Sequence, residues 1–495
     1  MLKIKNNNIK QFIKENFFND KYSLELRKWI IDNTKFENST PYKEASYAVI
    51  NPIDFCPVGC AHCMYSSRKL RSCKIDKKLM DSFIKLANQA NLKMLVFSGG
   101  GEPFENLEQM LRAIENIKSL KDIIIISSGY FAKTPKTTKN ILDKIYNAAN
   151  TKRERKNFKK LIITLRISRD SSQCEVVPLQ NLVNIINYVS GRNDPLKFRI
   201  LIRAILNYKE DEDSKLAEKL NFNLLPKKDK KNIYKDLPII DSFPTRWLIN
   251  EKEKIEIPII YKPLYFLGRA KNKNAQNIHS LWKIIQSEKN SGTPFNLCIR
   301  GPKGEGHNYY ETILKGYYFW KKNIKKIIYD TPKYKVKKKL ALYIPASGNI
   351  LINNGVPDIA PNLNKIKSWD QFLKIIYSDP IQRLLIEKGP FFIKSIAEEV
   401  EKGLTKKIEK TNFVFAISLL SLKTSVLRLY ITIRTLQYYY KINKIKADNS
   451  VIKKLIETDK KYYINFYKKR RNNFDNKKIK KPFTDPITGD AKSLS

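Results

Sequence analysis

The sequence predicts an α/β fold in which parallel strands alternate with helices and wind into a sheet or a barrel. The first observation behind this prediction is a change near residue 46, where short β-branched runs begin to alternate with longer amphipathic stretches. The second is that helix candidates lie between successive strand candidates, which is the pattern of parallel βα units. Right-handed crossovers between such strands favour a wound sheet or a barrel.

The strand and helix candidates follow one another along this part of the chain. The predicted strands are short runs rich in apolar and β-branched residues: Tyr47–Ile53, Met94–Ser98, Ile123–Ser127, Leu161–Ser168, Phe198–Leu206 and Ile255–Tyr261. The predicted helices are amphipathic: Lys77–Ala90, Leu107–Leu120, Thr137–Ala149 and Leu179–Ser190. Asp76 and Asn106 stand directly before two of these helices, so we expect them to be N-caps.

Pattern and composition divide the chain into five predicted regions. In order, they are a helical N-terminal extension, an α/β core, an α/β extension, a helical region and a mobile basic tail: residues 1–45, 46–270, 271–400, 401–471 and 472–495. Within the core, residues 207–254 interrupt the alternation with a polar, lysine-rich insertion.

The composition of the 495-residue chain is that of a folded protein without a membrane span. Apolar residues make up 42% of it, which excludes a disordered chain. Six cysteines and 17 glycines exclude a disulfide scaffold and a collagen. The start of the chain lacks the apolar stretch of a secretory signal, and no apolar run reaches the roughly 20 residues that cross a bilayer. We therefore expect a cytoplasmic protein with reduced cysteines.

The charge is strongly positive, with 94 Lys and Arg against 48 Asp and Glu and a formal net charge of +46. Lysine predominates together with Asn, Ile and Tyr, a joint bias typical of A/T-rich codon usage. The basic runs are scattered and do not form one stripe interleaved with aromatic residues, so a nucleic-acid partner is possible but less favoured. At low salt the field would still attract acidic partners.

Three cysteines with CxxxCxxC spacing, Cys56, Cys60 and Cys63, follow the first predicted strand. Pro57 and Gly59 indicate a loop, which can turn the three thiolates toward one metal centre. In a reducing compartment such a group is more typical of metal binding than of disulfides. Zinc would need a fourth ligand, for which only His62 or Cys73 is near in sequence. An iron–sulfur cluster held by three cysteines would keep one iron open, and the cysteines alone favour this alternative without excluding zinc.

A glycine-rich segment, Gly99-Gly100-Gly101-Glu102-Pro103, follows the second predicted strand. Glycines at the end of a strand let backbone N–H and C=O groups approach a ligand closely. By itself the segment is compatible with an ordinary tight turn. One βα unit after a CxxxCxxC loop, it indicates a cofactor site.

In these two motifs and their order, residues 46–270 resemble the radical S-adenosylmethionine superfamily. The resemblance implies a partial (β/α) barrel of about six parallel strands. It implies that Cys56, Cys60 and Cys63 hold a 4Fe-4S cluster whose open iron is chelated by the amino and carboxylate groups of S-adenosylmethionine. It also implies that four residues line the methionine amino group: Gly100, Gly101, Glu102 and Pro103. His62 occupies the position, usually aromatic, that lies near adenine.

Further cofactor contacts are expected at the ends of later strands. By the same resemblance, Ser128 and Ser168, with Arg166 or Asp170, would face the ribose and the methionine carboxylate. Arg203 interrupts an otherwise apolar strand, and we expect it to contact the cofactor. Capping of the strand ends is the alternative for each serine.

Residues Tyr343–Leu363 and the segment SWDQFLKIIYSDPIQRLL after them resemble the layout of the SPASM or twitch extension of peptide-modifying relatives. The cysteines of that extension are missing here. Cys73, Cys174 and Cys298 are too far apart in sequence to predict a second cluster, and we expect each to be an isolated thiol.

The resemblance implies an enzyme that reductively cleaves S-adenosylmethionine to a 5′-deoxyadenosyl radical, which abstracts hydrogen from a substrate. The degenerate extension favours a peptide or protein substrate, and the implied electron donor is a flavodoxin or a ferredoxin. An RNA-modifying enzyme of the same superfamily is one alternative, motivated by the charge. A zinc-binding interaction protein without redox chemistry is another. The sequence identifies no catalytic residue beyond the cofactor site.

Overall fold

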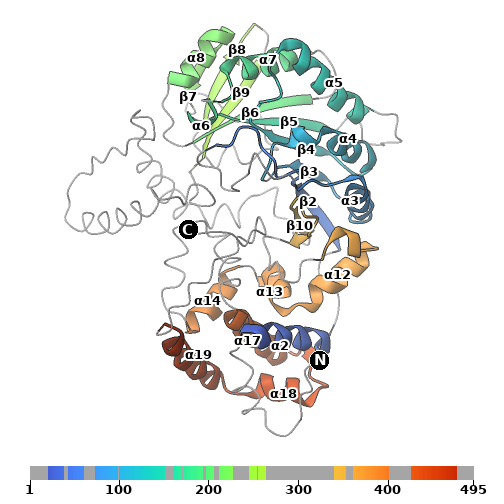
Figure 1. Cartoon of the computed structure of the whole chain (residues 1–495), viewed down its shortest axis with the longest axis vertical. Coiled ribbons are helices and arrows are strands. Elements are labelled where there is room, and N and C mark those ends of the chain that lie inside the picture. The colour runs from blue at the N-terminus through green and yellow to red at the C-terminus, as the bar shows by residue number, and fades with distance from the viewer. Residues whose placement is uncertain are drawn as a thin grey trace, which may run out of the picture. The chain divides into compact units, whose positions relative to one another are not determined.

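The computed structural model describes residues 20–37, 43–60, 73–98, 100–150, 161–169, 171–174, 176–192, 197–205, 211–226, 245–252, 255–262, 339–352, 361–388, 390–400 and 425–475. The chain divides into two compact units, whose elements are labelled in Figure 1. The larger unit comprises Ala45–Lys339 and Ile344–Gly348, and the smaller comprises Met1–Glu44, Leu340–Tyr343 and Asn349–Ser495.

The larger unit contains six neighbouring parallel strands. In spatial order they are β2 (Glu44–Ile50), β3 (Met94–Phe97), β4 (Asp122–Ser127), β5 (Ile162–Ser168), β6 (Lys197–Ile205) and β9 (Ile255–Lys262). All six correspond to strands predicted from sequence, which confirms the α/β class with a largely parallel sheet. Two antiparallel strands, β8 (Thr245–Asn250) and β7 (Asn223–Pro226), extend the sheet beyond β9. The sequence did not predict them, because β7 is short and both lie within the polar, lysine-rich insertion of residues 207–254.

Helices connect the parallel strands, and four of them were predicted: α3 (Lys77–Gln89), α4 (Leu107–Asn116), α5 (Pro135–Asn150) and α7 (Leu179–Ser190), with the 3-10 turn η1 (Pro103–Asn106) before α4. The sequence did not predict the short helix α6 (Ser171–Cys174) or α8 (Asp211–Leu220), which lies in the lysine-rich insertion. Asp76 caps α3, since its side chain accepts a hydrogen bond from the N–H of Leu79 at 2.8 Å. Helix α4 ends earlier than predicted, because Ile117 has an extended backbone.

The two faces of the parallel sheet differ in burial. In Figure 1 the helices α3, α4, α5 and α7 lie along one side of the strands. Alternate strand residues such as Ile125 and Leu165 are fully buried, whereas their neighbours Ile126 and Arg166 are half-buried. Residues paired across parallel strands share a face, and Ile126 is paired with Arg166. The sheet therefore has one face packed on helices and a second face that is less covered.

The smaller unit joins a helix that precedes the core to helices that follow it. Its elements are α2 (Asp20–Asn33), β1 (Lys35–Phe36), β10 (Lys339–Ile344, of which 340–343 belong here), β11 (Leu351–Ile352), η6 (Leu363–Lys365), α12 (Trp369–Ser378), α13 (Pro380–Lys388), α14 (Pro390–Val400), α17 (Ser425–Lys441), β12 (Ile445–Lys446), α18 (Ser450–Glu457) and α19 (Lys460–Asp475). Arg27 of α2 forms a buried ion pair with Asp379 and donates to the hydroxyl of Thr432 on α17 at 3.1 Å. These contacts fix α2 within the C-terminal helices.

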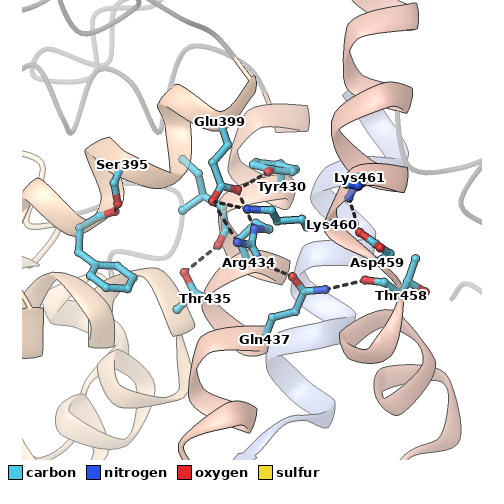
Figure 2. A network of polar contacts seen from close by, with 12 residues as sticks. Ser395, Glu399, Tyr430, Arg434, Thr435, Gln437, Thr458, Asp459, Lys460 and Lys461 are labelled. Atoms are coloured by element: carbon cyan, nitrogen blue, oxygen red, sulfur yellow. Dashed lines mark hydrogen bonds and ion pairs between the residues drawn. The ribbon is translucent and has the colours of Figure 1, made fainter.

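A polar network holds three of these helices together (Figure 2). Arg434 on α17 donates to both carboxylate oxygens of Glu399 on α14, at 2.8 and 3.0 Å. The hydroxyl of Tyr430 donates to the same carboxylate at 2.7 Å. Gln437 donates to the carbonyl oxygen of Thr458, just beyond the end of α18, at 2.8 Å. Because a carboxylate that accepts from a guanidinium and a hydroxyl is well satisfied, this network stabilises the helical unit.

Among the described residues, the structure contains no helix with the length and apolar character needed to span a bilayer.

Candidate cofactor site

The cysteine loop, residues 51–60, begins where β2 ends at Ile50. Gly59 has a φ of +61°, so the chain turns through the left-handed region between Cys56 and Cys60. This conformation explains the glycine within the motif, since other residues adopt it only with strain. Cys56 and Cys60 are half-buried and form no disulfide. Cys63 and His62 lie outside the described residues.

A returning segment fastens the cysteine loop from the other side. Ile53 and Lys74 form an antiparallel bridge, and the N–H of Asp54 donates to the carbonyl oxygen of Cys73 at 3.0 Å. This hydrogen bond places the backbone of Cys73 beside the cysteine loop. The side chain of Asn106 donates to the carbonyl oxygens of Pro52 and Ile75, both at 2.9 Å. Asn106 precedes α4 as predicted, but its side chain binds this loop and does not cap the helix.

The glycine loop, residues 100–103, packs directly on the backbone of the cysteine loop. A Cβ atom on Gly101 would lie 2.0 Å from the carbonyl oxygen of Ile53 and 2.6 Å from that of Phe55. The N–H of Glu102 donates to the same Phe55 oxygen at 2.9 Å. The structure shows that the missing side chain of Gly101 makes room for the neighbouring loop, while contact of Gly101 with a ligand stays a prediction. The two motifs therefore form one backbone-to-backbone unit.

The side chain of Glu102 connects the glycine loop to the end of β4. It is 2% exposed, and its carboxylate accepts from the hydroxyls of Ser127 at 2.7 Å and Ser128 at 2.6 Å and from the N–H of Ser128 at 3.0 Å. Burial raises the pKa of Glu102, while the hydrogen bonds from Ser128 and Ser127 oppose the increase. Pro103 is buried and begins η1. Through these hydrogen bonds, the Glu102 carboxylate holds the end of β4 next to the glycine loop.

The segment after β4, residues 128–132, is held from two further sides. Gly129 has a φ of +79°, and its carbonyl oxygen accepts from the side chain of Asn181 on α7 at 3.1 Å. Asn184, one turn along α7, donates to the carbonyl oxygen of Ala132 at 3.0 Å. The ring of Phe131 stacks on that of Phe104 with 3.8 Å between centroids. Ser128 is therefore presented by an ordered segment.

Ser168 and Arg203 are paired across β5 and β6 at the same edge of the sheet. Both are half-buried and lie on the less covered face. The N–H of Arg169 donates to the carbonyl oxygen of Arg203 at 2.7 Å and closes this end of the two strands. Within the part of the chain that the structure describes, the Arg203 guanidinium has no hydrogen bond or ion pair, so it can accept an anionic group.

The arrangement brings most of the sequence-predicted residues to one edge of the sheet, at the carboxyl ends of five adjacent strands. Those residues are Cys56, Cys60, Gly100, Gly101, Glu102, Pro103, Ser128, Ser168 and Arg203. Of the remaining predictions, His62, Cys63, Asp170 and Cys298 lie outside the described residues. Sequence reasoning missed Asn51, Asn181 and Asn184, whose side chains hold these loops. The one available indication was that Asn51 is a polar residue placed directly after an apolar strand.

The donor set of this edge fits an iron–sulfur cluster. Two half-buried thiols belong to a loop whose backbone is fixed by the glycine loop, and thiolates are the ligands that such clusters use. Within the described residues no three metal-ligating side chains gather, the third cysteine of the motif being outside them.

Comparison with known proteins finds a family model and solved structures that match parts of this chain. Residues 49–163 match the model of a 4Fe-4S single cluster domain. The crystal structure of Streptococcus suis SuiB bound to S-adenosylmethionine is 14% identical and has a TM-score of 0.30, over 78% of this chain and 76% of that one. No curated protein matches this chain.

The matched segment extends from β2 to β5 and contains both motifs, all three cysteines and the glycine loop. The match favours an iron–sulfur cluster over zinc at these cysteines. With its cluster-domain match, its motif order and its parallel βα core, the chain is similar to the radical S-adenosylmethionine superfamily in the features from which that resemblance was drawn.

Proposed function

We propose that this chain is a radical S-adenosylmethionine enzyme, with a 4Fe-4S cluster and S-adenosylmethionine as cofactors, and that it abstracts hydrogen from a peptide or protein substrate. The observation that carries the proposal is the succession of elements after the core, a hairpin followed by a helix. Strands β10 and β11 pair antiparallel through Leu342 with Ile352 and Tyr343 with Leu351, and α12 follows. This is the layout that the sequence shares with the extension of peptide-modifying relatives.

Local contacts show how this extension forms. Gly348 has a φ of +78° and its N–H donates to the carbonyl oxygen of Pro345, which closes the turn after β10. The N–H of Ile350 donates to the carbonyl oxygen of Pro361 at 2.8 Å. Ser368 caps α12 by accepting from the N–H of Gln371. The extension keeps an ordered hairpin and helix without cluster cysteines, which supports a role in holding substrate.

In the proposed mechanism, Cys56, Cys60 and Cys63 hold the cluster as thiolates, and the glycine loop receives the methionine end of S-adenosylmethionine. When bound, the cluster supplies the electron that cleaves S-adenosylmethionine and so generates the radical. Arg203 offers its guanidinium to the methionine carboxylate, and Ser128 and Ser168 offer hydroxyls to the polar groups of the cofactor. Glu102 keeps the Ser128 segment in place through three hydrogen bonds. The helix-covered side of the sheet excludes water from the strands behind the site.

The electron donor is proposed to be an acidic flavodoxin or ferredoxin. A net charge of +46 would steer such a protein toward the enzyme, and steering raises the encounter rate more than the final affinity. Screening shortens the Debye length from about 10 Å at 0.1 M salt to about 3 Å at 1 M. Turnover driven by flavodoxin should therefore fall steeply with salt, and turnover driven by dithionite much less. Equal salt slopes for the two donors would remove the steering proposal.

The experiment that tests the substrate class compares candidate peptides with transfer RNA. Protein reconstituted anaerobically with iron and sulfide is incubated with S-adenosylmethionine, dithionite and each candidate, with Cys56→Ala as the matched control. The expected result is that a peptide encoded beside this gene raises 5′-deoxyadenosine formation and changes mass, while transfer RNA does neither. Stimulation and modification of the RNA alone would overturn the peptide proposal in favour of RNA modification.

A further inference from the structure

A single buried side chain, that of Asn51, joins the cysteine loop to the glycine loop. Asn51 follows β2 directly and is 4% exposed. Its amide lies between the carbonyl oxygen of Ile53 and the backbone N–H of Gly100, so only one of its two orientations satisfies both groups. In that orientation Nδ2 donates to the Ile53 oxygen, and Oδ1 accepts from the Gly100 nitrogen at 3.0 Å.

The backbone of Asn51 is fixed independently of its side chain. Its N–H donates to the carbonyl oxygen of Ile344 at 2.8 Å. One strand along, the N–H of Ser98 donates to the carbonyl oxygen of Ile50 at 2.9 Å, so β2 and β3 remain in register up to the two loops. The amide of Asn51 is therefore a short bridge that starts from a rigid base.

We propose that Asn51 is a positioning residue that sets the spacing between the cluster and the methionine end of S-adenosylmethionine. The proposal rests on the cofactor roles proposed above for the two loops. Ile53 stands three residues before Cys56, and Gly100 begins the loop that receives methionine. Because a planar peptide whose N–H is held cannot rotate, Asn51 fixes the backbone groups that the glycine loop offers to the cofactor.

The bridge needs one donor and one acceptor at fixed positions. A leucine at position 51 would have similar size, but it would leave the Ile53 oxygen and the Gly100 N–H buried without their partner. An ionised aspartate would accept from Gly100 and would place negative charge against the Ile53 oxygen. A protonated aspartate would have a hydroxyl that donates and an oxygen that accepts, which reproduces both bonds. The aspartate variant should thus regain the bridge as pH falls.

The test measures affinity for S-adenosylmethionine by calorimetry, and the change in the electron paramagnetic resonance spectrum of the reduced cluster on adding it. Asn51→Leu should keep its iron and sulfide content and bind S-adenosylmethionine about tenfold more weakly or worse, which corresponds to losing a buried hydrogen-bond partner. Asn51→Asp should bind more tightly at about pH 6 than at about pH 8, in contrast to wild type, because burial shifts its carboxyl pKa upward.

Asn88→Leu is the matched control. Asn88 also bridges a carbonyl oxygen and an N–H with its amide, donating to Asn116 at 3.0 Å and accepting from Lys118 at 2.8 Å, but it joins α3 to the end of α4. Its variant should lower thermal stability and leave the affinity for S-adenosylmethionine unchanged.

Three outcomes would overturn the inference. They are an Asn51→Leu protein that binds the cofactor like wild type, a loss of affinity as large in Asn88→Leu, or an Asn51→Asp protein that does not fold at either pH. A wild-type protein whose spectrum is insensitive to S-adenosylmethionine would instead contradict the proposed function itself, so the two failures are distinguishable.

Discussion

The Cα of Gly101 lies so close to the carbonyl of Ile53 that no side chain fits between them. The cysteine loop and the glycine loop therefore share a surface made of backbone alone. A substitution in one of them must move the other.

The first prediction is that Gly101→Ala loses both cluster and cofactor binding. The added Cβ would need to displace the carbonyls of Ile53 and Phe55, which precede the cysteines. Iron content after reconstitution should fall severalfold, together with S-adenosylmethionine affinity. The control is Gly191→Ala, whose Cβ would meet only the carbonyl oxygen of Asn187 at 3.3 Å. A Gly101→Ala protein with full iron content would show that the loops move independently.

The second prediction concerns Gly59, whose φ of +61° lies in the left-handed region. Gly59→Ala should destabilise the turn between Cys56 and Cys60 by roughly 1–2 kcal/mol, because a Cβ is unfavourable there. Gly59→Asn should be less harmful, since asparagine adopts this region more readily. The measurement is the rate at which a chelator removes iron from each reconstituted protein. The order expected is Ala fastest, then Asn, then wild type, and equal rates would contradict it.

The third prediction is that the three motif cysteines account for all of the iron. Cys56→Ala, Cys60→Ala and Cys63→Ala should each abolish the visible absorbance of the cluster and the cleavage of S-adenosylmethionine. The combined replacement of the other three cysteines by alanine (Cys73, Cys174 and Cys298) should leave about four iron atoms per chain, the content of a single 4Fe-4S cluster. A loss of about half of the iron in that protein would reveal a second cluster.

The fourth prediction concerns acid stability of the helical unit. Burial by itself would raise the pKa of Glu399, but hydrogen bonds from Arg434 and Tyr430 and the charge of Arg434 outweigh it and lower the pKa. A lowered pKa in the folded state adds stability above the ordinary glutamate pKa, and this stability is lost as pH falls through the lowered value. Glu399→Gln should therefore destabilise the protein by about 1–3 kcal/mol at neutral pH. At a pH below the lowered pKa of Glu399, the difference from wild type should vanish.

Thermal unfolding of wild type and Glu399→Gln at both pH values measures this effect. The control is Glu457→Gln, whose ion pair with Lys453 spans 3.9 Å between two half-exposed side chains. Exposed pairs contribute little, so this variant should unfold like wild type at either pH. A pH-independent difference in stability between wild type and Glu399→Gln would contradict the lowered pKa assigned to Glu399.

The parallel core could be predicted from sequence because its strands are buried and its helices are strongly amphipathic. Leu179–Ser190 was predicted with both ends correct, since Pro178 and Gly191 bound it. The first strand was expected to end at Ile53 and ends at Ile50. Apolar pattern alone does not reveal that the chain there leaves the ladder to form the cysteine loop.

The site was predictable at its motifs and less so between them. Spacing alone identifies the cysteine loop and the glycine loop. The hydrogen bonds of Asn51 and Asn106 depend on which loops meet, and two segments that lie far apart in sequence give no local pattern for such a meeting. The role of Glu102 was likewise hidden, because its partners Ser127 and Ser128 stand 25 and 26 residues away.

The attachment of α2 to the C-terminal helices has a consequence for synthesis on the ribosome. Arg27 and its partner Thr432 are 405 residues apart. At about 5–20 residues per second, α2 emerges roughly 20–80 seconds before the helix that completes its surroundings. Meanwhile the apolar side chains of Leu26 and Ile30, fully buried in the finished protein, have no native surface to cover them. The central α/β unit can therefore fold before the helical unit that encloses it in sequence is complete.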